Sequence, residues 1–579
     1  MSDFVIGINS AYHESAACLL RGGEIVAAAE EERFTRVKHA KEPSVDNADH
    51  LPELAIQYCL QQGGIELSDV RSIGYSFAPG KRLQNIALTR HSIEGDWGSA
   101  AGEAAFQRVL ARVPEALASA FDTPVVDRFS WLDHHLCHAA SAFFCSPFDK
   151  GAVLSVDGIG EAASTLFAYG EGTQLSPIRE IRYPHSIGLL WEKLCRLLGF
   201  GPYDASKVMG LAAYGSPATY RLAMTELLTL TPNGEFLVAE ETVRLRQPDF
   251  AGIESLLGPP RGPGMPIVTR HADIAAALQE ATERALLHLA RHLHSLTGAD
   301  KLCLAGGVAL NCAAIRVIAD QGPYRFLFVQ PAANDAGTAI GAAFLASYTT
   351  GSTAARRPMR HAFLGPGFTD SEIRDTLASS GHRFSLPVCL GDTVAKMLAD
   401  GRIVGWFQGR MEFGPRALGN RSLLADPRRM DVKGRINDLI KHREDFRPFA
   451  PAILAEHVDD WYDLPRASQL AGRYMLVTAQ ARPGRASQIP AVVHIDGTSR
   501  LQVVDAESHP LFHDLLSRFH AITGVPLLLN TSFNDQEPIV CSPEDAMQTF
   551  DASPLDALAI GSFLVARSPY SDSFASSFP

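Results

Sequence analysis

One supersecondary unit occurs twice in the chain, and this repeat constrains the fold more than any other feature. Residues 4–29 read as a strand, a polar loop containing His13, a second strand, a Gly-Gly turn and a third strand. Residues 152–172 repeat that order about 150 residues later, with Asp157 opening the loop. Two such hairpins would face each other across a cleft, each presenting a polar loop at a strand end. We therefore predict an α/β fold with two related halves and a ligand, such as a nucleotide phosphate, between them.

Two histidines precede the second copy of the unit. His134 and His138 are four residues apart, so a helix would place both imidazoles on one face, close enough to share a metal ion. Asp157 ends a predicted buried strand and adds a carboxylate. Asp335 precedes another predicted helix, where it is either an N-cap or a fourth metal ligand. A histidine pair of this spacing also occurs by chance, and a register that uses His135 stays open.

Glycines mark two strand ends that suit a nucleotide. Gly158 follows Asp157 and lets the backbone approach a ligand closely. Gly306 and Gly307 separate a predicted strand at 301–305 from a helix that starts near Asn311. A strand, a double glycine and a helix N-terminus together form a seat for a phosphate or a ribose.

The character of the chain changes after residues 349–358, a linker-like stretch of Ser, Thr, Ala, Arg and Pro. We place the boundary between domains 1–355 and 356–579 there. In the second domain, glycine loops carry side chains that suit a small phosphorylated substrate, because arginine matches phosphate bidentately and lysine supplies a point charge. The alternative is a solvated basic face, which the Gly, Pro and aromatic neighbours disfavour. These side chains belong to Arg416, Lys441, Arg447, Arg500, Ser532 and Asn534.

Composition limits the classes of molecule that the protein is expected to bind. The chain has 579 residues with 52 Lys plus Arg against 64 Asp plus Glu, a formal charge of −12. This balance argues against nucleic acid or an anionic membrane as a partner. Nine scattered cysteines without a Cys-x-x-Cys pair suit a reducing compartment. There is no secretory signal and no apolar run of roughly 18 residues. We expect a soluble cytoplasmic protein, for which a homodimer is allowed.

Five motifs occur in a specific order, at residues 30–39, 208–215, 306–311, 412–422 and 530–534. Together they resemble the NodU/TobZ family of O-carbamoyltransferases over nearly the whole chain. The resemblance implies an N-terminal duplicated, actin-like domain of the ASKHA, RNase H-like type, similar to the tRNA threonylcarbamoyl-transfer enzymes. It also implies a C-terminal YrdC-like α/β domain that makes a carbamoyl-adenylate.

The resemblance further implies the reaction. Carbamoyl phosphate is cleaved to carbamate and phosphate, and carbamate attacks the α-phosphorus of ATP, used with Mg(II), to release pyrophosphate. The carbamoyl-adenylate then passes its carbamoyl group to the hydroxyl of a small acceptor, and AMP departs. A natural-product alcohol of the antibiotic type is the expected acceptor.

Residue roles are carried over from the same resemblance. Fe(II), or another divalent transition metal, would be held by His134, His138, Asp157 and Asp335. Carbamoyl phosphate would be bound by Arg416, Lys441, Arg447, Ser532 and Asn534. The nucleotide would contact Gly158, Gly306, Gly307, Asn311 and Arg500. Lys207 is either a phosphate contact or a surface lysine.

His13 is the candidate general base, because a neutral imidazole in the first ligand loop can accept the proton of an attacking hydroxyl. Its alternative role is a structural hydrogen bond. Glu14 follows it where the family usually has Asp, which puts the local geometry in doubt.

Two other functions compete with carbamoyl transfer. An actin-like small-molecule kinase would share the fold, but phosphoryl transfer there uses carboxylates and Mg(II) and needs no histidine pair. A tRNA-modifying protein of the threonylcarbamoyl type would need a basic stripe with aromatic residues, and the acidic balance disfavours it.

Overall fold

The computed structural model describes residues 3–86, 92–351 and 354–567. The chain forms two compact units. Unit 1 comprises Met1–Thr35, His39–Met359 and Arg466–Leu470. Unit 2 comprises Arg36–Lys38, Arg360–Pro465 and Ala471–Pro579. The main crossing from unit 1 to unit 2, at Arg360, lies close to the boundary predicted at 355/356.

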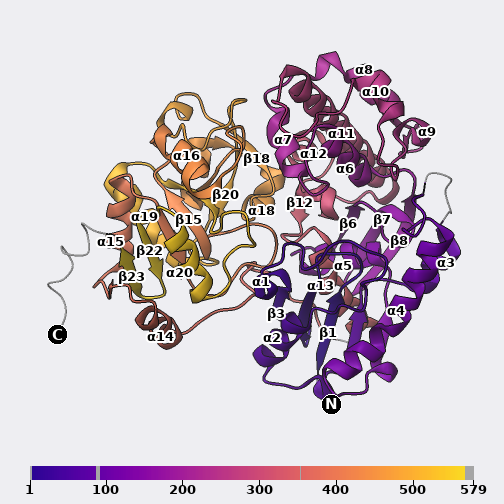
Figure 1. Ribbon diagram of the computed structural model, residues 1–579, viewed down its shortest axis with the longest axis horizontal. Helices are drawn as coiled ribbons and strands as arrows, with labels where there is room; N and C mark the ends of the chain where they lie inside the picture. Colours follow the sequence, from indigo (N-terminus) through magenta and orange to yellow (C-terminus); the bar gives the residue numbers. More distant parts are fainter. Residues whose placement is uncertain (1–2, 87–91, 352–353, 568–579) are drawn as a thin grey trace. The chain divides into compact units, whose positions relative to one another are not determined.

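Unit 1 contains two five-stranded sheets with the same strand order, β3-β2-β1-β4-β5 and β8-β7-β6-β11-β12 (Figure 1). In each sheet the first three strands are antiparallel neighbours, and the last two add in parallel. The predicted repeat and the duplicated α/β fold are therefore confirmed. The strands are β1 Phe4–Asn9, β2 Ala16–Arg21, β3 Glu24–Glu30, β4 Ser72–Tyr75, β5 Phe129–Trp131, β6 Lys150–Val156, β7 Ala163–Glu171, β8 Gln174–Arg182, β11 Lys301–Ala305 and β12 Phe326–Val329.

Two helices, α5 (His134–Cys145) and α13 (Thr338–Thr349), pack against each other between the sheets (Figure 1). Helix α13 lies on β1 and α5 lies on β6 and β11. Glycines permit the close approach, since a Cβ at Gly341 would lie 1.8 Å from the carbonyl oxygen of Cys137. A Cβ at Gly7 would lie 2.0 Å from the carbonyl oxygen of Ala339. The packing brings the N-terminal ends of α5 and α13 to the strand ends that carry polar residues.

The longest of the described helices of unit 1 is α11, Thr269–Thr297. Within residues 232–266, Phe236, Ile253 and Leu257 are buried and organise short elements. Those elements are β10 Phe236–Val238, α9 Glu240–Val243 and α10 Ala251–Leu257. The other elements are α1 Glu32–Thr35, α2 Glu53–Gly63, α3 Pro79–Asn85, α4 Ala100–Ala120, α6 Ile187–Leu197, α7 Ala205–Ala212, α8 Arg221–Leu227, β9 Leu228–Leu230 and α12 Cys312–Gln321.

Unit 2 is built on an eight-stranded sheet in the order β13-β23-β22-β14-β15-β21-β16-β20, with a small sheet β17-β18-β19. Buried Val, Leu, Ile and Phe side chains of the large sheet and its helices form one core. The strands are β13 Phe384–Ser385, β14 Val404–Phe407, β15 Arg421–Ala425, β16 Ala450–Leu454, β17 Tyr462–Asp463, β18 Thr478–Ala481, β19 Thr498–Arg500, β20 Gln502–Val504, β21 Leu527–Ser532, β22 Ala557–Ile560 and β23 Phe563–Ala566. The helices are α14 Asp370–Ser379, α15 Leu390–Ala399, α16 Met430–Ile436, α17 Val458–Trp461, α18 Gln469–Gly472, α19 Pro510–Thr523 and α20 Pro543–Ala552.

No helix among the described residues combines the length and the apolar character needed to cross a membrane.

Candidate metal centre and anion-binding cluster

Four side chains of unit 1 converge as a candidate metal centre. His134 and His138 lie one turn apart on α5, Asp157 follows β6, and Asp335 precedes α13. Their ligand atoms all lie within 4.8 Å of one another. The Nε2 atoms of His134 and His138 are each 3.7 Å from Asp157 Oδ2. Asp335 Oδ1 is 3.6 Å from His134 Nε2 and 3.3 Å from His138 Nε2. The structure thus brings the four predicted ligands together.

The chemistry of this donor set fits a divalent transition metal. The Nε2 atoms of both histidines are buried and have no hydrogen-bond partner among the described residues, a costly state unless an ion occupies their lone pairs. Burial opposes protonation, yet Asp335 and Asp157 still raise the pKa of His134 well above its usual range. The pocket therefore favours positive charge. Two imidazoles and two carboxylates suit iron, zinc or manganese better than Mg(II).

His135 lies outside the cluster. It is fully buried, and its ring centroid is 5.5 Å from that of His134 and 6.0 Å from that of His138. Burial lowers its pKa to about 4, so its ring is neutral. A Cβ at Gly160 would lie 2.8 Å from His135 Nδ1, which means that His135 packs against the glycine loop.

Each of the two acidic ligands is positioned by one amide–carboxylate hydrogen bond. The amide of Gly307 donates to Asp157 Oδ1 at 2.6 Å, and Gly306 makes the required turn with φ of 86°. The amide of Asp335 donates to Glu14 Oε2 at 3.0 Å, while Glu14 Oε1 lies 3.3 Å from His39 Nδ1. Glu14, which departs from the family pattern, is thus long enough to reach the second half of unit 1.

A third carboxylate, Glu161, anchors the helix that carries the histidines. Its side chain is 1% exposed, and Oε1 accepts hydrogen bonds from the backbone amides of Ala78 at 2.7 Å and His134 at 3.0 Å. The loop around Glu161 is held in turn by Arg82, which donates to the carbonyl oxygens of Gly160 and Glu161. Arg82 also forms a buried bidentate pair with Glu103 at 2.6 and 2.8 Å. The position of His134 therefore depends on Glu161.

The candidate general base lies in an aromatic group. The His13 ring centroid is 5.0 Å from that of Tyr203 and 6.3 Å from that of His39, and Tyr203 is 4.6 Å from His39. His13 Nδ1 is buried without a hydrogen-bond partner among the described residues. The structural hydrogen bond that was the alternative role for His13 is therefore not formed through Nδ1.

Asn311 and Lys207, the two other residues considered as nucleotide or phosphate contacts, both have side-chain partners within unit 1. The side-chain amide of Asn311 exchanges two hydrogen bonds of 2.9 Å with Gln279, and its Oδ1 caps α12 by accepting from the Ala314 amide. Lys207 lies 3.1 Å from Asp204 Oδ2. Asn311 therefore orients the helix after the double glycine, and Gly158 stays the open backbone position beside Asp157.

In unit 2, the structure brings Lys441, Ser532 and Asn534 together. Lys441 Nζ donates to the carbonyl oxygens of Ser532 at 2.5 Å and Asn534 at 2.6 Å, and to Asn534 Oδ1 at 2.6 Å. Ser532 Oγ donates to Asn534 Oδ1 at 2.7 Å. Lys441 is buried at 3% exposure, and burial with the neighbouring Arg443 holds its pKa well below its usual range. The lysine thus shapes the loop that carries Ser532 and Asn534.

Three arginines concentrate positive charge beside this lysine. Burial, together with Arg447 and Arg500, lowers the pKa of Arg443 to about 9. The Arg443 guanidinium stacks 4.4 Å from the Phe449 ring and donates through Nε to Asn437 Oδ1 at 2.8 Å. Its Nη2 is buried with no hydrogen-bond partner in the described part of the chain. Neighbouring cations, one of which keeps an unused donor, form a candidate anion-binding cluster, which consists of Lys441, Arg443, Arg447 and Arg500.

The loop that carries Arg416 is organised by one buried carboxylate. Glu412 Oε1 accepts hydrogen bonds from the amides of Leu418 at 2.6 Å, Asn420 at 2.8 Å and Arg421 at 3.3 Å. This arrangement fixes the turn on which Arg416 stands.

Two family models match the chain: the carbamoyltransferase N-terminus over residues 5–344 and the carbamoyltransferase C-terminus over residues 395–567. The chain belongs to the carbamoyltransferase family. The predicted resemblance is thereby confirmed, and the protein is an enzyme of that class. The first model spans the metal ligands, and the second spans the anion-binding cluster.

Relatives of this carbamoyltransferase include two nodulation proteins and a cephem O-carbamoyltransferase. It is 39% identical over 564 residues to nodulation protein NolNO of Sinorhizobium fredii, covering 96% of this chain and 80% of NolNO. It is 34% identical over 347 residues to a 3'-hydroxymethylcephem-O-carbamoyltransferase of Amycolatopsis lactamdurans, covering 57% and 58%. Nodulation protein U of Bradyrhizobium diazoefficiens is 36% identical over 274 residues, covering 46% and 45%. Among solved structures, full-length HypF in its phosphate- and nucleotide-bound form matches with a TM-score of 0.36 and 12% identity, covering 61% of this chain and 56% of HypF.

Three residues that shape the two candidate sites were given no role from the sequence: Glu161, Glu412 and Arg443. The two glutamates act on backbone amides, which leave no side-chain pattern. Arg443 did have a signal, because it stands two residues after Lys441 and four before Arg447.

Proposed function

We propose that the protein is an ATP-dependent O-carbamoyltransferase that works through a carbamoyl-adenylate. The observation that carries the proposal is the separation of two opposite sites. Unit 1 holds a buried cluster of imidazoles and carboxylates that calls for a cation, whereas unit 2 holds a cluster of buried cations that calls for an anion. One chain thus has the parts for phosphate chemistry and for a separate transfer step.

In unit 2, the anion-binding cluster and Arg416 would hold carbamoyl phosphate. Water cleaves it to carbamate and phosphate, and a carbamate oxygen attacks the α-phosphorus of ATP, which is supplied with Mg(II). Pyrophosphate leaves, and the carbamoyl-adenylate remains. Arg443 and Arg447 stabilise the charge that develops on the phosphoryl oxygens, because fixed guanidinium donors do not have to reorganise during the reaction. Ser532 and Asn534 orient the substrate beside Lys441.

In unit 1, the acceptor hydroxyl attacks the carbamoyl carbon, and AMP leaves. His134, His138, Asp157 and Asp335 would hold the metal ion, which when bound polarises the carbamoyl oxygen. His13 accepts the hydroxyl proton at its imidazole, for which the unpartnered Nδ1 is available. The adenosine side would contact the backbone at Gly158, Gly306 and Gly307, of which Gly158 is the open position. Carbamate derivatives are protected where water is excluded.

The acceptor is proposed to be a hydroxylated small molecule. The cephem relative is named for transfer to a hydroxymethyl group, which supports an alcohol of the natural-product type. The metal ion bound by unit 1 is proposed to be Fe(II) or another divalent transition ion.

The proposal is tested by product analysis. The purified protein is incubated with ATP, carbamoyl phosphate and a panel of alcohols, and nucleotides are separated by chromatography. The expected products are AMP, pyrophosphate and a carbamoylated alcohol, all dependent on carbamoyl phosphate. Formation of ADP without need for carbamoyl phosphate would identify a kinase and overturn the proposal.

A further inference from the structure

One serine of unit 1 contacts both the metal centre and the loop of the candidate general base. Ser76 directly follows β4, and its amide continues the strand pairing by donating to the carbonyl oxygen of Ile8 at 3.0 Å. The residue is completely buried. Its carbonyl oxygen and its hydroxyl have different partners, so each makes a separate contribution to the site.

The carbonyl oxygen of Ser76 supports a metal ligand. It lies 3.3 Å from His134 Nδ1. A carbonyl oxygen only accepts hydrogen bonds, so the hydrogen of the neutral imidazole is held on Nδ1, and the lone pair of Nε2 faces the carboxylates. His138 differs, because its Nδ1 is buried without a hydrogen-bond partner in the part of the chain that the structure describes. Ser76 therefore fixes the tautomer of one histidine ligand, as supporting groups of metal sites do.

The hydroxyl of Ser76 supports the loop that carries His13. Ser76 Oγ donates to Asn9 Oδ1 at 2.8 Å. The same contact orients the Asn9 amide, because an oxygen that accepts from the hydroxyl leaves Nδ2 on the other side. Asn9 Nδ2 then donates to the carbonyl oxygens of His13 at 3.3 Å and Glu14 at 3.0 Å. The hydroxyl thus acts on the His13 loop through one buried amide.

The backbone of this loop needs such a support. Tyr12 has φ of 62° and Glu14 has φ of 53°, in the left-handed region that residues other than glycine rarely adopt. Each such conformation costs roughly 1–3 kcal/mol and persists only where surrounding contacts hold it. His13 lies between these two residues, so the position of its imidazole depends on the hydrogen bonds from Asn9.

A third contact joins Ser76 to the other half of unit 1. Thr338, the first residue of α13, is completely buried. Its Oγ1 lies 3.0 Å from Ser76 Oγ and 2.6 Å from the carbonyl oxygen of Asp335. The hydroxyl hydrogen of Ser76 is used by Asn9, so the single hydroxyl hydrogen of Thr338 serves both oxygens. Ser76 therefore lies in a buried chain that runs from the His13 loop to the residue before α13 that carries a metal carboxylate.

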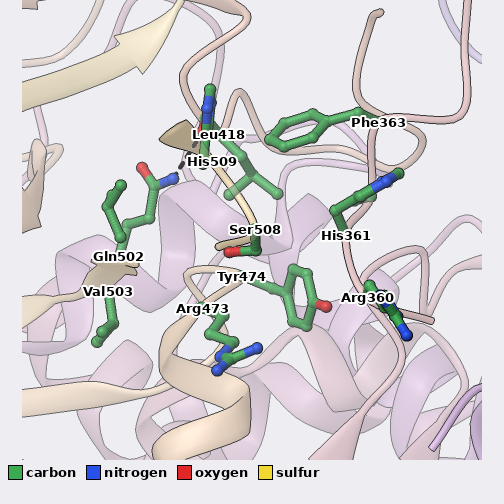
Figure 2. A pocket seen from close by; sticks show the side chains of 12 residues that line it. Arg360, His361, Phe363, Leu418, Arg473, Tyr474, Gln502, Val503, Ser508 and His509 are labelled. Carbon is green, nitrogen blue, oxygen red and sulfur yellow. Dashed lines mark hydrogen bonds between the residues drawn. The ribbon is translucent and has the colours of Figure 1, made fainter. Parts of the chain in front are cut away.

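Buried histidines of unit 2 lack these supports. His361 and His509 line a small cavity, and Figure 2 shows them beside Phe363, with Arg360 and Arg473 among the other side chains. The described residues that line this cavity include no acidic side chain, and burial lowers the pKa of His509 to about 4. Burial alone therefore does not make a histidine a metal ligand, and unit 1 adds carboxylates and a fixed tautomer.

We infer that Ser76 is a positioning residue that sets the metal centre and the general base relative to each other, with its carbonyl oxygen orienting His134 and its hydroxyl holding the His13 loop. The inference rests on the proposed function and adds the one residue on which the base and a metal ligand both depend. The two contributions can be separated by experiment, because Ser76→Ala removes the hydroxyl and keeps the carbonyl oxygen.

The first test measures transfer from supplied carbamoyl-adenylate to an alcohol. Ser76→Ala should lower kcat roughly 10- to 100-fold, because a displaced base loses its reactive geometry, while KM for the alcohol stays nearly unchanged. Ser72→Ala is the matched control, since Ser72 is buried on β4 and its hydroxyl has no hydrogen-bond partner among the described residues. In a His13→Ala background, Ser76→Ala should cost less than about twofold, since residues that act through one another are not additive. Equal losses with and without His13 would overturn the inference.

The second test needs no turnover. Co(II) is titrated into the metal-free chain and followed by visible absorption, and hydrogen exchange of residues 10–15 is followed by mass spectrometry. Ser76→Ala should keep the Co(II) affinity within about threefold, well short of the 10–100-fold that loss of a supporting partner costs. Exchange in the loop should quicken roughly tenfold, and Ser72→Ala should change neither quantity. Unchanged exchange in Ser76→Ala, or a loss of Co(II) affinity as large as that of His134→Ala, would overturn the inference.

Failure of the inference and failure of the proposed function give different results. AMP formation that depends on carbamoyl phosphate and an alcohol is measured in the wild type. If it occurs while Ser76→Ala behaves like Ser72→Ala, only the role of Ser76 is wrong. If it does not occur, the proposed function has failed, and the inference falls with it.

Discussion

The metal centre and the anion-binding cluster differ in how their charges are arranged. In the metal centre, opposite charges surround two buried nitrogens without partners, and the ligands stand on helix α5 and at strand ends. In the anion-binding cluster, like charges are held close together, and Lys441 is surrounded by protein oxygens. The first site therefore favours a cation, and the second favours an anion.

The supports of the two sites differ as well. The metal ligands are positioned by carboxylate–amide contacts from Glu14 and Glu161 and by the amide of Gly307. Lys441 ends a π-helical turn, Asn437–Lys441, and is followed by His442 with φ of 44°. Irregular backbone of this kind is common at functional sites. The first site is therefore built on regular helix and strand ends, whereas the second is built on irregular backbone.

The largest expected effect is loss of one half-reaction while the other half-reaction continues. His138→Ala should reduce metal affinity by more than about 100-fold, since even loss of a supporting partner costs 10–100-fold. Carbamoylation of the alcohol should cease, while pyrophosphate release in unit 2 continues. Metal content is measured by atomic emission. In the wild type, chelation of the metal should stop carbamoyl transfer, and adding the metal back should restore it. His288→Ala on α11 is the control, and equal loss of both half-reactions would refute two independent sites.

The second prediction concerns the other site. Arg416→Ala should slow carbamoyl phosphate turnover by about 10²–10³, the usual cost of one donor that stabilises developing charge. Transfer from supplied carbamoyl-adenylate should continue at the wild-type rate, with Arg429→Ala as the exposed control. Failure of supplied adenylate to restore transfer would assign Arg416 another role.

The third prediction tests the support of the metal centre. Glu161→Ala leaves the buried amide of His134 without its acceptor, at a cost of about 1–3 kcal/mol, and also removes the acceptor of the part-buried Ala78 amide. Metal affinity should fall roughly 10–100-fold, as followed by the visible spectrum of bound Co(II). Glu161→Gln keeps one acceptor oxygen and should retain most of the affinity, so equal losses in the two variants would contradict a positioning role.

The smallest effect concerns pH. Burial and Arg443 hold the pKa of Lys441 below its usual value, so the folded, empty site binds fewer protons than the unfolded chain above that pKa. A bound anion raises the pKa again, and binding takes up a proton. Sulfate affinity should therefore decline as pH rises, by at most about tenfold per pH unit for one coupled proton. Calorimetry in buffers of different ionisation enthalpy measures the uptake, which should vanish in Lys441→Met.

The outline of the fold and most of both sites could be predicted from sequence for physical reasons. Strand patterns and glycine turns are local signals, so the repeat of unit 1 was visible. The four-residue spacing of His134 and His138 is also local. Asp335 was ambiguous, because an N-cap and a metal ligand look alike before a helix. Glu161 could not be predicted, since its partner Ala78 lies 83 residues away and contributes only a backbone amide.

The contact of Glu14 with the Asp335 amide has a further consequence. Glu14 follows the first strand of one half of unit 1, and Asp335 follows the last strand of the other half. The position of the Asp335 ligand thus depends on a carboxylate of the other half. A ligand that strengthens this contact between the halves would be linked thermodynamically to the metal ion, so each would raise the affinity of the other by the same factor. A change in metal affinity would therefore report the binding of such a ligand without any turnover.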